Sequence, residues 1–352
     1  MRKRLNIKSK IHDYSVYFEK NIHKVIQSFP QESVYIVDTN VYKIFLKNYL
    51  KNKKFICINS NENNKDFLSL SKVINFFIKN ISKETTVISV GGGVIQDITS
   101  FVCSVFKRGV EWFFIPTTII SQGDSCIGGK TSINYMGIKN QLGNFYPPKK
   151  IILNPNFVKK LPKQEFFSGM GEMGHYFFLS NKKDYLFYKN FLKKVVLNKK
   201  IDLYKIIFKS LEIKKKYIEK DEFDKNLRLN LNYGHTFGHA IENLTHLPHG
   251  IAVAHGMDIS NYISFKNHLI SHQTYFEMKE TLKMILNSYK IKKINITKMI
   301  GLIKKDKKST KKNIRVILTK GIGKMFVSKI KDKKKFTKDL NDYCYENNIN
   351  FS

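Results

Sequence analysis

Three consecutive glycines between a strand-like and a helix-like segment limit the folds that are open to this chain. The segment TTVISVGGGVIQDITSFVCSVF, from Thr85 to Phe106, passes from a run rich in β-branched residues through Gly91, Gly92 and Gly93 into a helical pattern that begins near Val94. Glycines at such a turn let the main chain approach a ligand, and the N–H groups at the start of the helix then face an anion. The segment therefore predicts a parallel α/β unit with a site for a phosphate or pyrophosphate group.

Other short apolar runs share the first part of the chain with this segment. They lie at residues 33–38, 54–58, 112–116 and 151–155. Polar or helix-patterned segments separate them, as in parallel α/β folds. Beyond residue 155, long segments such as 184–196 and 201–223 carry apolar residues at three- and four-residue spacing, which is typical of amphipathic helices. We therefore expect an α/β domain over residues 1–155 and a mostly helical domain over residues 156–352.

The composition bears on whether the chain binds nucleic acid and whether it is secreted or inserted in a membrane. The formal net charge is +34, and clustered cations would indicate a nucleic-acid-binding protein. Here the lysines run along the whole chain together with many Asn, Ile, Phe and Tyr residues, so compositional bias explains the charge and we expect no specific nucleic-acid partner. Four scattered cysteines favour reduced thiols and a cytoplasmic location. With no apolar run long enough for a signal peptide or a membrane span, we expect no membrane partner.

Histidines concentrate in one segment. Five of the ten lie in NLNYGHTFGHAIENLTHLPHGIAVAHGM, from Asn230 to Met257. His235 and His239 are four residues apart and share one face of a helix, which Glu242 continues. Because HTFGH lacks the glutamate of an HExxH zinc site, a third metal ligand has to come from elsewhere, and Glu172 in SGMGEMGHYF is a candidate. Two histidines and one carboxylate leave an open position on a zinc-like ion, although structural histidines remain the alternative.

Two further glycine-rich loops carry cations. IPTTIISQGDSCIGGKTSIN contains Asp124 and Lys130, and GIKNQLGNFYPP contains Lys139 and Asn140. Lysines in glycine-rich loops indicate an anionic cofactor beside an anionic substrate. The alternative is that they are solvated surface charges.

In this order, the segments resemble the 3-dehydroquinate synthase family of the sugar-phosphate cyclases. The motifs that carry the resemblance are GGGVIQD, FKRGVEWFFIPTT, DSCIGGKT, KNQLGNFYPP, GEMGHY, KKKYIEKDE, RLNLNYGHTFGHAIE, HGIAVAHGM and KKDKK. The resemblance implies a Rossmann-like domain that binds NAD, a helical domain that binds metal and substrate, and an active site in the cleft between them. It also implies one divalent metal, zinc or cobalt, and a homodimer.

The implied activity is that of a lyase of the shikimate pathway. The substrate would be 3-deoxy-D-arabino-heptulosonate 7-phosphate, and the products 3-dehydroquinate and phosphate. The implied steps are a transient oxidation, β-elimination of phosphate, reduction, ring opening and an intramolecular aldol closure.

The resemblance assigns site residues position by position. Those implied to ligate the metal are Glu172, His235 and His249. Those implied to contact the substrate are Arg108, Lys130, Asn140, Lys214, Arg228, Asn232, His239 and either Lys307 or Lys308, within a lysine-rich loop expected from about Lys304 to Lys312. Those implied to act in catalysis are Asp124, Lys130, His175, Lys214, Arg228, Asn232 and His239. Those implied to contact NAD are Asp38, Asn40, Glu62, Lys65, Gly92, Gly93, Asp97, Thr117, Thr118, Asp124, Lys130 and Lys139.

Some of these residues have a specific implied role. Lys214 and Arg228 would bind the substrate carboxylate, and Arg108 would reach the phosphate from the partner subunit. This carboxylate pair favours the leading function over another sugar-phosphate cyclase, which would act on sedoheptulose 7-phosphate or glucose 6-phosphate. A metal-dependent polyol dehydrogenase and an inactive relative are the further alternatives.

The chain departs from the family pattern at three positions. Gln96 replaces a glycine, His175 replaces a lysine beside the substrate hydroxyls, and Ile251 replaces a glutamate near the metal-binding His249. We expect Ile251 to remove an outer partner of the metal site and to lower metal affinity. His175 either keeps a polar contact or weakens the activity.

Overall fold

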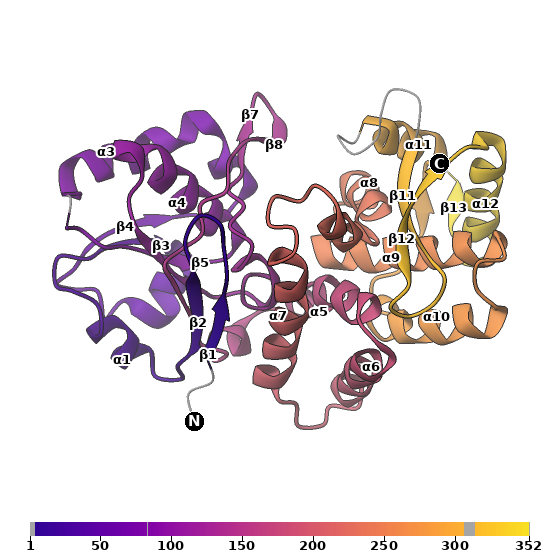
Figure 1. Ribbon diagram of the computed structural model, residues 1–352, viewed down its shortest axis with the longest axis horizontal. Coiled ribbons are helices and arrows are strands. Elements are labelled where there is room, and N and C mark those ends of the chain that lie inside the picture. Colours follow the sequence, from indigo (N-terminus) through magenta and orange to yellow (C-terminus); the bar gives the residue numbers. More distant parts are fainter. Residues whose placement is uncertain (1–3, 83, 306–313, 352) are drawn as a thin grey trace. The chain divides into compact units, whose positions relative to one another are not determined.

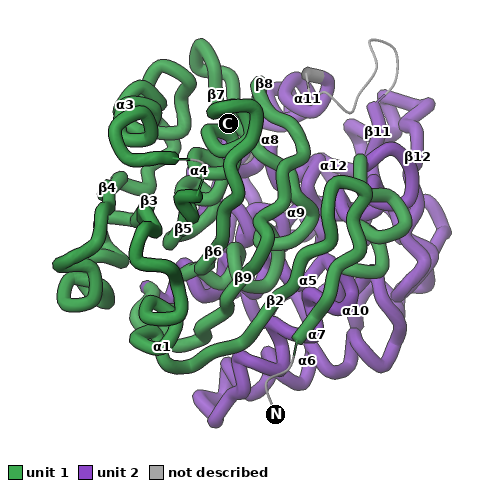
Figure 2. The backbone as a smooth tube through the Cα atoms, turned by 60° about the vertical axis from the view of Figure 1, so that its left-hand side comes forward, with its two compact units in different colours: residues 1–161, 215–223 green, residues 162–214, 224–352 purple. Residues whose placement is uncertain are grey.

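The computed structural model describes residues 4–82, 84–305 and 314–351. It contains two compact units, which Figure 2 distinguishes by colour. Unit 1 comprises Met1–Leu161 and Lys215–Phe223, and unit 2 comprises Pro162–Lys214 and Asp224–Ser352. No described helix combines the length and the apolar character that crossing a membrane requires.

The two units differ from the division expected at residue 155, because unit 1 continues to Leu161 and includes a second segment. Carboxylates of that second segment accept hydrogen bonds from the main chain near the N-terminus. The N–H of Lys8 donates to Glu219 over 2.8 Å, and the N–H of Lys10 donates to Glu222 over 2.7 Å. These contacts join residues more than 200 positions apart, which hydrophobic periodicity does not reveal.

Unit 1 is built on a seven-stranded sheet in the order β1-β2-β9-β6-β5-β3-β4. Its strands are β1 (Arg4–Ile7), β2 (Tyr14–Phe18), β3 (Val34–Asp38), β4 (Lys54–Ile58), β5 (Val87–Gly91), β6 (Trp112–Pro116) and β9 (Lys150–Leu153). β1 and β2 form an antiparallel hairpin, and all other neighbours are parallel. Every residue of β3 and β5 is buried, which explains their unbroken apolar runs. The parallel α/β prediction is confirmed, although the sequence did not predict β1 and β2.

Helices and one hairpin complete unit 1. They are α1 (Ile22–Gln27), α2 (Thr39–Val41), η1 (Tyr42–Leu46), η2 (Glu62–Lys65), η3 (Phe67–Leu70), α3 (Ser71–Asn80), α4 (Gly93–Val105), η4 (Phe106–Arg108), η5 (Ser121–Ser125), η6 (Phe157–Lys160) and the hairpin of β7 (Ile133–Tyr135) and β8 (Ile138–Leu142). A core cluster that includes Val25, Tyr35, Leu46 and Ile88 packs the helices against the sheet.

The strand order contains a topological switch point between β3 and β5. β4 lies beside β3 on one side, and β6 lies beside β5 on the other side, so the connections that leave β3 and β5 run in opposite directions. In parallel α/β sheets, ligands bind at such a switch point, outside the carboxyl ends of the strands.

Unit 2 is mostly helical, as the sequence predicts (Figure 1). Its helices are α5 (Lys163–Leu179), α6 (Lys182–Val196), most of α7 (Leu203–Ile218), η7 (Leu227–Asn232), α8 (His235–Thr245), α9 (His249–Lys266), α10 (His272–Leu286), α11 (Ile296–Lys305) and α12 (Lys333–Glu346). Two small sheets were not predicted, namely β11 (Ile314–Thr319) with β12 (Met325–Ile330) and β10 (Lys293–Ile294) with β13 (Asn350–Phe351). Of the expected lysine-rich loop, Lys304 and Lys305 belong to α11, and residues 306–312 lie outside the described residues.

Candidate functional site

Three helices of unit 2 bring one carboxylate and two imidazoles together. Glu172 lies on α5 with only 3% of its surface exposed, His235 is the first residue of α8, and His249 is the first residue of α9. Nε2 of His235 lies 3.2 Å from Oε1 of Glu172, and Nε2 of His249 lies 3.4 Å from Oε2. The structure therefore brings the three residues predicted as metal ligands together, with one imidazole beside each oxygen of the Glu172 carboxylate.

Glycines explain how these helices approach so closely. A Cβ atom on Gly250 would lie 1.8 Å from the carbonyl oxygen of Ser168, and one on Gly171 would lie 2.1 Å from the carbonyl oxygen of Gly250. A Cβ atom on Gly256 would lie 2.0 Å from the carbonyl oxygen of Gly234. The main chain of α9 is thus in direct contact with α5 and with the start of α8. Each predicted ligand directly follows or precedes one of these contact glycines in the sequence.

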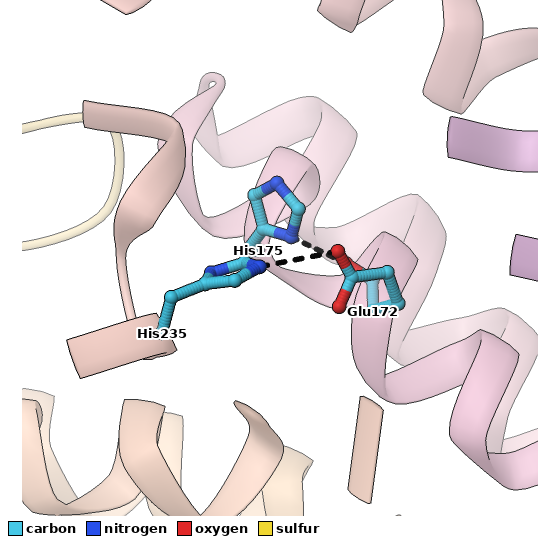
Figure 3. A group of neighbouring side chains, drawn as sticks. All are labelled: Glu172, His175 and His235. Carbon is cyan, nitrogen blue, oxygen red and sulfur yellow. Dashed lines mark hydrogen bonds and ion pairs between the residues drawn. The ribbon is translucent and has the colours of Figure 1, made fainter. Parts of the chain in front are cut away.

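His175 also belongs to this cluster. It lies on α5 one turn after Glu172 and is 1% exposed. The metal-ligating atoms of Glu172, His175 and His235 all lie within 4.8 Å of one another, and Figure 3 shows both rings beside the carboxylate. The rings of His175 and His235 are nearly perpendicular, with their centroids 5.1 Å apart.

Electrostatics favour a charged cluster at this place. Burial favours the neutral acid of Glu172, but His235 and His249 outweigh burial and hold the pKa of Glu172 well below its ordinary value. Burial lowers the pKa of His249, whereas the carboxylates of Glu172 and Glu242 raise it more strongly, to about 10. The carboxylate therefore stays ionised in a buried position, where a cation stabilises it.

A second carboxylate orients His249. Nδ1 of His249 lies 2.8 Å from Oε2 of Glu242, which leaves Nε2 facing Glu172. Sequence reasoning placed Glu242 on the histidine face of its helix but missed this contact, because a loop separates the two residues. Glu242 is thus an outer partner of His249 in this chain, where position 251 carries an apolar side chain. The expected loss of metal affinity stays a prediction.

The donor set fits a divalent metal ion. Imidazole nitrogens and a carboxylate oxygen are the ligands that zinc and similar ions take in catalytic sites. Buried Oε2 of Glu172 makes no hydrogen bond among the described residues, although Nε2 of His249 lies near it.

The other histidines of the segment lie outside this trio. His239 is exposed on α8, and its ring centroid lies 5.6 Å from those of His235 and His249. His246 is the C-cap residue of α8, and His255 is buried with Nε2 2.9 Å from the carbonyl oxygen of Tyr289.

In unit 1, predicted cofactor residues line the carboxyl ends of the sheet strands. Asp38 ends β3, and its side chain accepts hydrogen bonds from the N–H groups of Asn40 and Val41. Gly92 and Gly93 begin α4 after β5, while Thr117 and Thr118 follow β6. A Cβ atom on Gly92 would lie 2.9 Å from Cγ2 of Thr118, so only glycine fits this turn without a shift. The structure thus collects these residues at the switch point.

A buried lysine connects further predicted residues of unit 1. Nζ of Lys65, which is 6% exposed, lies 2.8 Å from Oδ2 of Asp97 and donates to Oδ1 of Asn140 over 2.8 Å. Burial raises the pKa of Asp97 to about 6 against the opposing effect of Lys65. Oε1 of Glu62 accepts a hydrogen bond from Asn134, which the sequence did not single out. Asn140, expected on the phosphate side of the substrate, is thus hydrogen-bonded to a predicted NAD-contacting residue.

The remaining predicted residues of unit 1 lie on turns and loops. Asp124 lies in η5, and Gln96 holds this turn through its side chain. Nε2 of Gln96 donates to the carbonyl oxygen of Ser125 over 2.7 Å, and Oε1 accepts from the Ser125 hydroxyl over 2.6 Å. The departure from the family glycine therefore fixes the turn that carries Asp124. Lys130, Lys139 and Arg108 are exposed, the last with a left-handed φ of 66°.

Unit 2 contains the other predicted substrate residues. Lys214 on α7 and Arg228 on η7 are 6% and 4% exposed, unusually low values for cationic side chains. Asn232 ends η7, and its side-chain amide donates to the carbonyl oxygen of Leu229. Lys307 and Lys308 lie outside the described residues.

Two consecutive family models match the chain. The model described as 3-dehydroquinate synthase N-terminal matches residues 55–168, and the model described as 3-dehydroquinate synthase C-terminal matches residues 169–309. Curated relatives include the 3-dehydroquinate synthase of Buchnera aphidicola subsp. Cinara cedri, which is 36% identical over 86% of this chain and 86% of that protein. The 3-dehydroquinate synthase of Clostridium tetani is 36% identical over 88% of this chain and 87% of that protein.

Solved structures share the fold. A 2-deoxy-scyllo-inosose synthase complexed with carbaglucose-6-phosphate, NAD⁺ and Co²⁺ matches with a TM-score of 0.84 at 19% identity, over 97% of this chain and 99% of that chain. A 2-epi-5-epi-valiolone synthase from Streptomyces hygroscopicus subsp. jinggangensis with NAD⁺ and Zn²⁺ bound matches with a TM-score of 0.82 at 18% identity, over 96% of this chain and 99% of that chain. These likenesses confirm the predicted fold.

Proposed function

The chain belongs to the 3-dehydroquinate synthase family, and from this premise we propose that it converts 3-deoxy-D-arabino-heptulosonate 7-phosphate into 3-dehydroquinate and phosphate. The observation that carries the proposal is the cluster of Glu172, His235 and His249, within a chain that the two family models cover from residue 55 to residue 309. The enzyme is an NAD- and metal-dependent lyase of the shikimate pathway.

The metal is zinc or cobalt, the two ions bound with NAD⁺ in the solved relatives. When bound, the metal supplies Lewis acidity toward a substrate hydroxyl, and NAD⁺ accepts and later returns a hydride. Glu172, His235 and His249 would hold the ion, and Glu242 keeps Nε2 of His249 directed toward Glu172.

The carboxyl edge of the sheet in unit 1 binds NAD. The N–H groups at the start of α4, beside Gly92 and Gly93, would bind the pyrophosphate. The other residues proposed to contact NAD are Asp38, Asn40, Glu62, Lys65, Asp97, Thr117, Thr118, Asp124, Lys130 and Lys139. Lys65 and Asp97 form an ion pair over 2.8 Å, and both side chains would offer polar contacts to the cofactor.

Buried cations in unit 2 bind the substrate carboxylate. Lys214 and Arg228 are shielded from solvent, which strengthens their attraction for an anion. Asp124 provides a carboxylate for the reacting hydroxyls, and His175 lies beside the metal ligands. The groups proposed to hold the phosphate are Arg108, Lys130, Asn140, Asn232, His239 and Lys307.

The assembly and location also remain proposals. We assign a homodimer, in which Arg108 reaches the partner's substrate phosphate, and a cytoplasmic location that suits the four free cysteines. Placement of the active site between the two domains stays a prediction.

The carboxylate distinguishes this function from that of another sugar-phosphate cyclase. The test compares steady-state turnover of 3-deoxy-D-arabino-heptulosonate 7-phosphate and sedoheptulose 7-phosphate, since only the first carries a carboxylate. We expect turnover of the first alone, and Arg228→Gln to raise its KM by about 10- to 100-fold because a charged hydrogen bond is lost. Lys189→Gln, which removes a surface cation paired with Glu277, leaves KM unchanged. Preferred turnover of sedoheptulose 7-phosphate would contradict the proposal.

A further inference from the structure

We propose that His175 is a fourth protein ligand of the metal centre, beside Glu172, His235 and His249. The inference rests on the metal dependence of the proposed function and is independent of the substrate's identity. It concerns the position where this chain carries an imidazole in place of the lysine of the family pattern.

Helix geometry directs His175 toward the metal site. Glu172 and His175 are three residues apart on α5, so their side chains leave the same face of the helix. Two ligands at this spacing serve one ion in helical metal proteins. His175 therefore needs no rearrangement of the main chain to reach the ion that Glu172 binds.

The distances agree with a shared ion. The ligating atoms of Glu172, His175 and His235 lie within 4.8 Å of one another. Two ligand atoms of one tetrahedral zinc ion are about 3.4 Å apart, since each lies about 2.0–2.1 Å from the metal. Side-chain shifts of roughly an ångström or less close this difference. The binding of one ion by all three residues is therefore a local adjustment.

The imidazole of His175 can exchange its hydrogen bond for a bond to the metal. Nδ1 of His175 donates its hydrogen to the main-chain carbonyl oxygen of Glu172, which can only accept. Figure 3 shows this nitrogen on the side of the ring that faces the carboxylate. When Nδ1 binds the ion, the neutral ring carries its proton on Nε2, so no net proton is gained or lost. One hydrogen bond is replaced by a bond to the metal.

A fourth protein ligand changes the number of ligands that the metal ion must accept in order to bind the substrate. A catalytic zinc site ordinarily has three protein ligands and one open position, because tetrahedral coordination holds four atoms. An ion held by Glu172, His175, His235 and His249 must accept a fifth ligand before it binds a substrate oxygen. The centre therefore favours ions that readily take five or six ligands.

Counting the metal-bound imidazoles tests the proposal directly. In the Co²⁺-loaded full-length protein, each bound imidazole contributes one solvent-exchangeable N–H signal to the paramagnetically shifted proton NMR spectrum. We expect three such signals in the unaltered protein and two in His175→Gln. His255→Gln, which replaces a buried histidine that contacts Tyr289 instead, retains three. Two signals in the unaltered protein would overturn the proposal without reference to any variant.

Metal affinity provides the second readout. Loss of an outer partner of a metal ligand typically lowers affinity about 10- to 100-fold, and loss of a ligand costs no less. His175→Gln and His175→Lys should therefore weaken Zn²⁺ binding at least about 10-fold in chelator competition. Zn²⁺ affinity is unchanged in His255→Gln. Unchanged affinity in both His175 variants, folded by circular dichroism, would overturn the proposal. No substrate is present, so failure of the proposed enzymatic function leaves this result intact.

Discussion

Nδ1 of His249, the first residue of α9, lies 2.8 Å from Oε2 of Glu242 on α8. This contact orients the imidazole so that Nε2 lies 3.4 Å from the central carboxylate of Glu172. A carboxylate behind a metal-binding histidine fixes the ring and makes it a more basic ligand. Glu242 thus supports His249 from the side of the ring opposite to Glu172.

Removal of the supporting carboxylate should weaken metal binding. We expect Glu242→Ala to lower Zn²⁺ affinity about 10- to 100-fold, because His249 loses the partner of its Nδ1. A chelator-competition titration measures the change. Glu277→Ala, which removes a carboxylate paired with Lys182 on the surface of the same unit, is the matched control and keeps the original affinity. Equal affinities in the two variants would show that Glu242 has no part in the centre.

The central carboxylate should be indispensable. In Glu172→Gln a neutral amide replaces the buried charge between His235 and His249, so Zn²⁺ affinity should fall by about 100-fold or more. Equilibrium dialysis with metal analysis measures this loss. Glu165→Gln changes an exposed glutamate in the first turn of the same helix and serves as the control. Tight, stoichiometric binding of Zn²⁺ by Glu172→Gln would show that Glu172 is not a metal ligand.

The glycine contact between α5 and α9 should tolerate no side chain. In Gly250→Ala the new Cβ atom would lie 1.8 Å from the carbonyl oxygen of Ser168, so the helices must move apart. We expect a loss of about 3 kcal/mol or more in the free energy of unfolding. Gly301→Ala on α11 meets no atom within 4 Å and should be neutral or stabilise the chain by up to about 1 kcal/mol. Urea denaturation compares the two variants. Similar stabilities would contradict the packing described for α9.

Asp97 should make unit 1 less stable as pH rises. Its pKa is raised from 3.8 to about 6, mainly by burial, so the folded chain holds this proton more tightly than the unfolded chain. The stabilising contribution is full below about pH 4 and is lost as pH rises through about 6. In Asp97→Asn this loss, at most about 3 kcal/mol, is absent. Thermal unfolding of the NAD-free protein from pH 4 to 7 measures it. A constant difference between the two proteins across this range would contradict the assignment.

The sequence predicts the parts of the fold that are locally encoded. β4 and β6 occupy the predicted ranges, and β3 begins one residue later than expected. β3 and β6 appear as continuous apolar runs because they are parallel strands that are almost fully buried, whereas β4 is an edge strand whose residues are mostly half-buried. β11 and β12 were missed since each strand depends on its neighbour, and β12 alternates buried and exposed positions only weakly. No local sequence pattern predicts the hydrogen bonds of Lys8 and Lys10 with residues 219 and 222.

In the candidate site, too, contacts between residues of different elements could not be predicted from the sequence. Residue types and motif order identify Glu172, His235 and His249, and the structure places them together. Sequence spacing gave no indication that Glu242 contacts His249 across a loop or that Gln96 holds the turn of Asp124. Such pairs depend on how helices pack, which the glycine contacts of α9 determine here.

The most direct test of the proposed function is the product balance of the purified protein. The full-length chain is loaded with Zn²⁺ or Co²⁺, supplied with NAD⁺ and 3-deoxy-D-arabino-heptulosonate 7-phosphate, and assayed for inorganic phosphate and 3-dehydroquinate. We predict equal amounts of both products without net formation of NADH, abolished by a chelator and restored by metal. A protein that binds NAD⁺ and metal but releases neither product would contradict the proposed function.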